Sequence, residues 1–354
     1  MPHADYPQEA LADLPGVTFS AMRQMILMHA SASNLKVLED EGEHLTVETA
    51  HGLIGLRPGK TSSTAGMVAA RNAHWLFVMK NAVVEQMRRA LPEVAKAMRW
   101  SDGDVEGTLP PNFIFMRARQ VEQLGPVFLR VTLEGDDVSS HGEDAIHFRL
   151  LQPPKNTEPE WPTVASNGST IWPEGPGAPH RPVYTTRFKD EASGTLVTDV
   201  YVHEGGRTTA WAKEVMAGER GRTVVGVVGP SGGGLLHADR VLIASDETGL
   251  PAAARLLENL PRNATGVVYL EAEHGAACDY PIEAPDGVEL HWLSRTKGGV
   301  LADATLAALP SHGGAKIWFA GEREQAKRVR DAAKSAGWEA GDLRVSAFWK
   351  LADK

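Results

Sequence analysis

The first hundred residues show helical and alternating hydrophobic patterns in turn. Residues 19–32 carry Met, Leu and Ile at helical spacing, and residues 36–56 alternate roughly, with a break at Glu41-Gly42 that is typical of a hairpin. A second amphipathic helix, kinked at Pro92, is predicted where apolar residues recur every three to four positions, at Val84, Met87, Leu91, Val94 and Met98. We therefore expect a small α+β domain over residues 1–104.

Methionine is frequent in this block. Its thioethers could serve as metal or haem ligands, but Met more often fills irregular gaps in a core. We therefore expect packed core positions for Met22, Met25, Met28, Met67 and Met79.

After a linker-like stretch of turn residues and prolines at 101–111, short strand-like segments follow one another closely. They are NFIFMRARQVEQL, VFLRVTLEG, AIHFRLL, RPVYTTRF, TLVTDVYVH and RTVVGVVGP. Many short strands with few helical stretches predict a small antiparallel β-barrel, which we assign to residues 105–234. A proline-rich stretch over 152–181 interrupts it, and a loop of this length is usually functional or mobile.

From residue 238 strands alternate with helical segments. VLIAS precedes PAAARLLENL, and KIWFAG precedes EREQAKRVRDAAKSAG. This alternation predicts a parallel sheet, with ligands at the carboxyl ends of its strands. We assign residues 235–354 to an α/β domain of the nucleotide-binding type. The generic GxGxxG fingerprint is absent, and Gly229–Gly234 is interpreted as the connection between the two domains.

Charge and composition exclude several classes of protein. Lys and Arg total 36 against 45 Asp and Glu, so the net charge is −9, which argues against a general nucleic-acid binder. The chain has one cysteine, no signal-peptide pattern at its start and no run of 18 apolar residues, so we expect a cytoplasmic protein without membrane spans. Its 13 histidines form no metal-binding motif, and no protein metal site is predicted.

The strand at 181–187 carries the first chemical signal. Arg181 supplies a cation for a pyrophosphate, Tyr184 an aromatic plane for a flavin ring, and Thr185 a hydrogen-bond donor for the flavin N5. The alternative is an ordinary strand with an edge arginine and a buried tyrosine.

About 20 residues later, two glycines precede a predicted helix that begins at Thr208-Thr209. Free N–H groups and the positive end of the helix dipole favour an anion at such a start. Simple helix capping by Thr208 is the alternative. The turn Asp246-Glu247-Thr248 follows the first α/β strand, where a nicotinamide dinucleotide would bind.

Seven segments, taken in chain order, resemble the siderophore-interacting proteins over roughly residues 110–350. They are RPVYTTR, DVYVHEGGRTTAWA, VVGP, LIASDETGLPA, HWLSR, AGERE and FWK. These are FAD-dependent ferric-siderophore reductases with a ferredoxin reductase-like fold. The family usually has Pro, Ala and Ser where Arg207, Thr208 and Thr209 stand, and Gly where Ser245 stands. Residues 17–95 resemble a small domain of unknown function that is sometimes fused ahead of this reductase.

The resemblance implies a set of site residues. Tyr184 and Thr185 would serve catalysis, and cationic side chains near the flavin would bind the substrate. The implied FAD- and NAD(P)H-binding residues are Arg181, Tyr184, Thr185, Thr186, Arg187, Tyr201, Val202, His203, Thr208, Thr209, Asp246, Glu247 and Thr248, and the implied substrate-binding residues are Arg149, Arg295 and Lys350.

The implied activity is hydride transfer from NADH or NADPH to FAD, followed by one-electron reduction of siderophore-bound Fe(III) and release of Fe(II). The ferric siderophore is the expected partner, and ferredoxin is an alternative electron donor. Two other hypotheses keep the flavin: a flavin reductase with another acceptor, and a non-catalytic siderophore-binding or redox-sensing flavoprotein.

Overall fold

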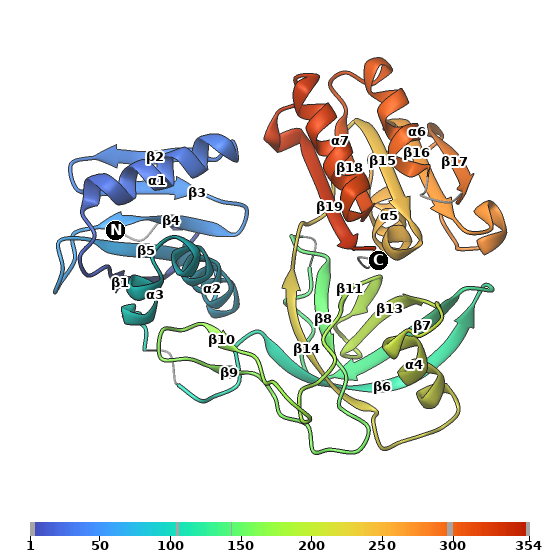
Figure 1. Cartoon of the computed structure of the whole chain (residues 1–354), viewed down its shortest axis with the longest axis horizontal. Coiled ribbons are helices and arrows are strands. Elements are labelled where there is room, and N and C mark those ends of the chain that lie inside the picture. Colours follow the sequence, from blue (N-terminus) through green and yellow to red (C-terminus); the bar gives the residue numbers. More distant parts are fainter. Residues whose placement is uncertain (1–3, 104–105, 143, 296–299, 352–354) are drawn as a thin grey trace. The chain divides into compact units, whose positions relative to one another are not determined.

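The computed structural model describes residues 4–103, 106–142, 144–295 and 300–351, and it divides into two compact units. The first unit comprises residues 1–113 with 153–179, and the second comprises residues 114–152 with 180–354. Figure 1 labels the elements of both units.

The first unit is built on a five-stranded antiparallel sheet of order β1-β5-β4-β3-β2. Its strands are β1 (Gln8–Asp13), β2 (Lys36–Glu41), β3 (His44–Glu48), β4 (Gly52–Arg57) and β5 (Ala65–Ala70), and its helices are α1 (Phe19–Ala32), α2 (Ala73–Ala90) and α3 (Pro92–Ala97). The predicted helix at 19–32 and the hairpin at Gly42 are both present. Pro92 does not kink one helix, because it lacks an N–H and instead stands at the start of α3.

The methionines of this unit differ in exposure. Met22, Met67 and Met79 are buried as predicted, whereas Met25 is 37% exposed and Met28 is 66% exposed. The prediction of core positions is therefore wrong for the last two, whose side chains on α1 are exposed.

The proline-rich segment packs with this unit. It contains the short pair β9 (Thr163–Val164) and β10 (Thr170–Ile171). Asn81 on α2 donates its side-chain N–H to the Gly168 carbonyl at 3.1 Å, and the Trp100 indole donates to the Asn167 carbonyl at 3.1 Å.

The second unit begins with a seven-stranded sheet of order β11-β8-β14-β6-β7-β13-β12. The two outer strands, β11 and β12, are consecutive in the chain, so the sheet closes into a barrel. The strands are β6 (Phe113–Leu124), β7 (Phe128–Gly135), β8 (His147–Leu151), β11 (Val183–Thr185), β12 (Phe188–Asp190), β13 (Thr195–Tyr201) and β14 (Val224–Ser231), with helix α4 (Arg207–Met216) after β13.

A five-stranded parallel sheet of order β17-β16-β15-β18-β19 follows. The strand order reverses between β15 and β18, and ligands of such sheets bind at the carboxyl ends on either side of that reversal. The strands are β15 (Arg240–Asp246), β16 (Thr265–Ala272), β17 (Gly287–Ser294), β18 (Lys316–Glu322) and β19 (Leu343–Trp349). The helices are α5 (Leu250–Glu258), α6 (Leu301–Ala308) and α7 (Arg323–Ser335), with 3-10 turns η1 (Glu247–Gly249), η2 (Gly275–Cys278), η3 (Leu309–Ser311) and η4 (Ala340–Asp342).

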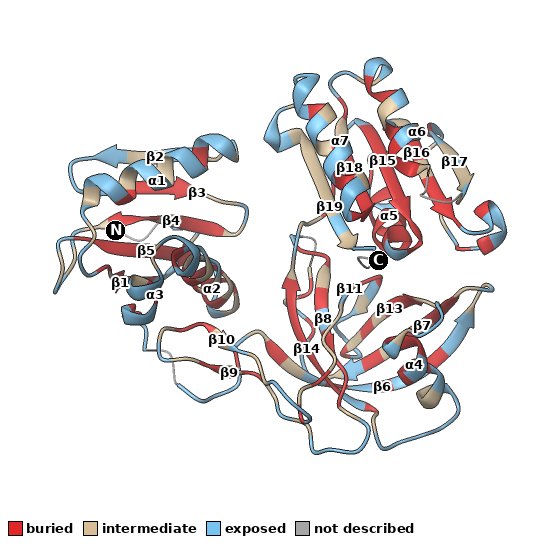
Figure 2. Cartoon of the chain, viewed as in Figure 1, coloured by how far each residue is buried: buried red, intermediate tan, exposed pale blue. Residues whose placement is uncertain are grey.

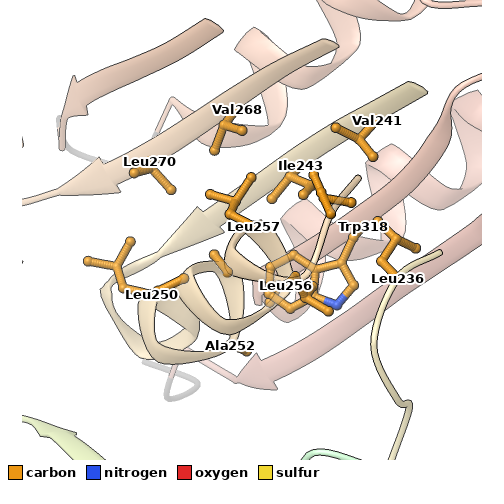
Figure 3. Close-up of a cluster of buried hydrophobic side chains, with 14 of the residues drawn as sticks. Leu236, Val241, Ile243, Leu250, Ala252, Leu256, Leu257, Val268, Leu270 and Trp318 are labelled. Carbon is orange, nitrogen blue, oxygen red and sulfur yellow. The ribbon is translucent and has the colours of Figure 1, made fainter. Parts of the chain in front are cut away.

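Burial explains why these segments form a parallel sheet. The central strand β15 is buried from Val241 to Asp246, as a strand covered by helices on both faces must be (Figure 2). Figure 3 shows Leu250, Leu256 and Leu257 of α5 packed against side chains of β15, β16 and β18. The antiparallel barrel followed by a parallel α/β domain confirms the predicted fold class.

Candidate functional site

A cavity of about 460 Å³ lies within the second unit, where the barrel strands meet the carboxyl ends of β15 and β19. Barrel strands β8, β11 and β13 line one side, and η1 and β19 line the other. The lining residues are His147, Pro182, Val183, Tyr184, Thr185, Asp199, Tyr201, His203, Ser231, Gly232, Glu247, Thr248, Pro251, Ser346, Ala347 and Phe348.

Pairing of β8 with β11 arranges the barrel side of this cavity. Thr185 lies opposite His147, and Tyr184 lies opposite Phe148. Alternation therefore places Thr185 and His147 on one face of the strands and Tyr184 on the other. The Thr185 hydroxyl lies 3.2 Å from His147 Nδ1, within hydrogen-bonding distance. Tyr184 packs against the barrel core and also lines the cavity.

His147 is held in its neutral form. Burial, with additional repulsion from Arg255 and Arg344, lowers its pKa from 6.5 to about 4. Its ring meets Phe348 edge-on, with ring centroids 5.6 Å apart. At neutral pH the imidazole therefore carries one N–H and one lone pair, and it can orient the Thr185 hydroxyl without adding charge.

Two tyrosines in the cavity keep their phenolic protons. Burial raises the pKa of Tyr184 to about 12. Burial and the neighbouring Glu247 raise the pKa of Tyr201 to about 12. The His203 ring lies near that of Tyr201, at a centroid distance of 6.1 Å. Both hydroxyls are neutral hydrogen-bonding groups at physiological pH.

Helix α4 begins at an uncapped glycine. Gly206 is the N-cap residue and has no side chain that could accept a hydrogen bond from the first turn. The capping hydrogen bond to a backbone N–H of that turn is therefore missing. A Cβ at Gly206 would approach Thr209 Oγ1 to 2.8 Å and His203 Nε2 to 2.9 Å. The Thr208 hydroxyl instead accepts from the Gln152 side-chain amide at 2.9 Å, so the helix-capping alternative for Thr208 is wrong. This glycine cradle and the helix dipole fit a pyrophosphate.

The turn after β15 holds a buried carboxylate. Asp246 accepts hydrogen bonds from the Thr248 N–H at 2.9 Å and from the Trp349 indole at 2.6 Å. Burial raises the pKa of Asp246, and the hydrogen bonds from these partners oppose that effect. Asp246 therefore shapes the turn, whereas its neighbours Glu247 and Thr248 face the cavity.

Arg295 is engaged by two carboxylates. It forms an ion pair with Glu247, its Nε lies 3.1 Å from Glu271, and its guanidinium lies 5.8 Å from the centroid of Trp349. These partners offset its charge and fix its position at the carboxyl edge of the sheet.

The other predicted cations lie outside the cavity lining. Arg149 is exposed on β8, but its guanidinium is partly desolvated, and this desolvation together with repulsion from Arg181 lowers its pKa. Lys350 is exposed after β19. Arg187 is buried in a bidentate ion pair with Glu258 of α5. The structure thus brings Tyr184, Thr185, Tyr201, His203, Glu247 and Thr248 together in the lining, and leaves out Arg149, Arg181, Thr186, Arg187, Val202, Thr208, Thr209, Asp246, Arg295 and Lys350.

Several cavity residues escaped the sequence analysis. His147 and Phe348 come from segments about 200 residues apart, and the Gly232 region had been interpreted as a connector. Asp199 is buried, accepts from the Tyr280 hydroxyl at 2.7 Å and pairs with Arg130 at 2.7 Å. A buried aspartate in the middle of an apolar strand is the one sequence signal that could have identified a member of this group.

Among the described residues, no group of three or more His, Cys, Asp or Glu side chains is placed to hold a metal ion. No helix in the described ranges is both long and apolar enough to cross a bilayer.

Comparison with known proteins identifies both halves of the second unit. A family model described as "Siderophore-interacting FAD-binding domain" matches residues 117–234, and one described as "Siderophore-interacting protein" matches residues 238–352. A NADPH-dependent ferric-chelate reductase of Escherichia coli is 30% identical over 237 residues, covering 65% of this chain and 90% of that protein. A ferric vibriobactin reductase of Vibrio cholerae is 30% identical over 262 residues, covering 70% of this chain and 92% of that protein.

Solved structures agree with the fold. The crystal structure of a siderophore utilization protein from T. fusca superposes with a TM-score of 0.54 at 26% identity, covering 71% of this chain and 98% of that one. The fold and the FAD-binding match define an oxidoreductase that uses FAD with a nicotinamide nucleotide. The chain belongs to the siderophore-interacting protein family. The predictions of family, enzyme class and cofactors are confirmed.

Proposed function

We propose that the chain is a ferric-siderophore reductase that draws electrons from NADH or NADPH. The cavity between β11 and the carboxyl edge of the parallel sheet carries this proposal, because it joins the predicted flavin strand to the predicted nucleotide turn. FAD, when bound, supplies a ring that accepts two electrons as a hydride and passes them on singly. The names of the two reductase relatives support the same acceptor class.

The chain's own residues would position the cofactor. Arg181 and the uncapped start of α4 would bind the pyrophosphate, as a cation and free N–H groups suit an anion. Tyr184 and Thr185 would contact the ring from β11. His147 would act as a positioning residue, because its Nδ1 lies against the Thr185 hydroxyl and decides whether that hydroxyl donates or accepts.

The remaining groups would serve the donor and the acceptor. Thr248 and the turn at Asp246 would contact the nicotinamide nucleotide at the reversal of strand order. Arg149 and Lys350 would attract a negatively charged ferric chelate, since both are exposed cations. The carboxylate partners of Arg295 offset its positive charge, so it would attract an anionic substrate less strongly. We therefore assign Arg295 mainly to holding Glu247 in place.

An anaerobic visible spectrum tests the proposal. Purified protein with FAD is treated with NADH or NADPH, and then with a ferric tris-catecholate or tris-hydroxamate in the presence of a coloured Fe(II) chelator. We expect the flavin band to bleach with one nucleotide and to return on addition of the ferric complex, with stoichiometric Fe(II). A reduced flavin that no ferric complex reoxidises would instead support a flavin reductase with another acceptor. A flavin that neither nucleotide reduces would support a ferredoxin donor or a redox sensor.

Site variants test the cofactor assignment separately. Arg181→Ala and Tyr184→Ala should purify with depleted FAD, whereas Arg323→Ala, which removes an exposed cation on α7, should retain it. Full flavin occupancy in both site variants would refute the assignment of β11.

A further inference from the structure

The first unit contains a cavity of its own that no part of the proposed reaction uses. Its volume is about 500 Å³, within the range of roughly 300–1,000 Å³ typical of small-molecule sites. Helices α1 and α2 provide its walls, and strands β4 and β5 provide its floor. All residues that line this cavity precede residue 117, where the first of the two family models begins.

Apolar side chains dominate the walls of the cavity, and residues without large side chains leave the space inside it. Met22 and Ile26 face the cavity from α1, and Val83 and Met87 face it from α2. On the floor, Gly66 has ordinary backbone geometry and nothing closer than 3.8 Å to where its Cβ would stand. A side chain would therefore fit at this position, and the lack of one at Gly66 leaves part of the cavity volume empty.

The chemistry of the lining selects an uncharged occupant. Among the described residues that line it, none is Asp, Glu, Lys or Arg, and the polar groups are His29, Thr49, His51 and Gln86. An ion would lose its hydration here without gaining a charged partner. An apolar molecule would restore the packing contacts that opposing walls lose across a void. Methionine side chains adapt readily to irregular ligands.

We propose that the first unit binds an uncharged, mainly apolar small molecule between α1, α2 and the sheet, with its polar group directed at the histidines or Gln86. Met25 and His29 are exposed on α1 and mark the open side through which it would enter. The proposal does not depend on the reductase function, and either can fail without the other.

Methionine-methyl NMR on the full chain, saturated with FAD, provides a site-specific test. The probes are neutral 1-naphthol and its charged analogue 1-naphthalenesulfonate. We expect 1-naphthol to shift the signals of Met22, Met79 and Met87 saturably, and to bind at least ten-fold more tightly than the sulfonate. Met116 and Met216, which lie in the second unit, should not shift.

Two variants and a control complete the experiment. Gly66→Leu fills the floor, and Ala82→Trp obstructs the cavity from an exposed position on α2, where folding is not at risk. Both should weaken 1-naphthol binding at least ten-fold. Ala73→Trp, exposed on the same helix but away from the lining, should leave it unchanged.

The proposal is overturned by the absence of saturable shifts in wild type, by unaltered binding in Ala82→Trp, or by equal affinity for the two probes. Methionine signals could instead shift when the protein is diluted and stay unchanged when the probe is added. That result would assign the cavity to a contact between two copies of the chain, and it would also overturn the proposal.

Discussion

Acidification should destabilise this protein through His147 well before its carboxylates are neutralised. The imidazole is buried beside Thr185 and Phe348, and Arg255 and Arg344 add repulsion to its charged form. The perturbation is a change of pH from 7 to 4.5, compared between wild type and His147→Asn. Asparagine keeps a polar atom near the Thr185 hydroxyl but does not titrate.

The magnitude follows from the two pKa values. In the folded protein the pKa is about 4, and in the unfolded chain it takes its ordinary value of 6.5. Between these values the unfolded chain binds a proton that the folded protein does not, so stability falls as the pH falls. The full difference corresponds to roughly 3 kcal/mol, of which about 2 kcal/mol is lost between pH 7 and pH 4.5. Above pH 6.5 the effect vanishes.

Urea denaturation at both pH values, without added flavin, measures this loss. All other titrating groups are shared by the two proteins, so their contributions cancel in the comparison. At a slope of about 3 kcal/mol per molar urea, the midpoint of wild type should fall by roughly 0.7 M more than that of His147→Asn.

Parallel pH dependence of the two midpoints would refute the reasoning, because it would mean that His147 titrates equally in both states. A wild type that gains stability on acidification relative to the variant would show that a carboxylate partner raises the pKa of His147.

Three further predictions concern contacts of the second unit. Gly206→Ala should weaken FAD binding at least about ten-fold, because its Cβ would crowd the start of α4, whereas Gly221→Ala, with open space around its Cβ, should leave the affinity measured by flavin titration unchanged. Tyr280→Phe should cost about 2 kcal/mol in urea denaturation, since it removes a 2.7 Å hydrogen bond to the buried Asp199 carboxylate, and a loss below the error of the method would contradict this. Glu258→Gln should lower Tm by roughly 5 °C in calorimetry, because it leaves a buried guanidinium without its counter-charge, and an unchanged Tm would show that the pair is not formed.

Local patterns predicted much of the fold because they depend on near neighbours. The helix at 19–32 follows from apolar spacing, and the parallel sheet follows from strands alternating with helices. Pro92 was harder to place, since the pattern on either side of it continues in register. Only the backbone shows that the chain turns at Leu91 and starts a new helix.

The candidate site shows the same division. Tyr184, Thr185 and Thr248 were predicted because short motifs carry them, and all three line the cavity. His147 and Phe348 were missed, because neither stands in a motif that the sequence analysis assigned to the flavin or nucleotide site. Pairing of β8 with β11 and of β18 with β19 brings them to the same place.

The sequence by itself determined the family and the order of barrel and α/β domain, because the patterns that show them reside in contiguous residues. The tertiary structure decided which charged side chains are available to bind a ligand and which are paired within the protein. Arg187 and Arg295 are both cations in family motifs, yet one is buried against Glu258 and the other is held by Glu247 and Glu271. The partners of a charged group lie far away in sequence, and the free energy of that charge depends on those partners and on its burial.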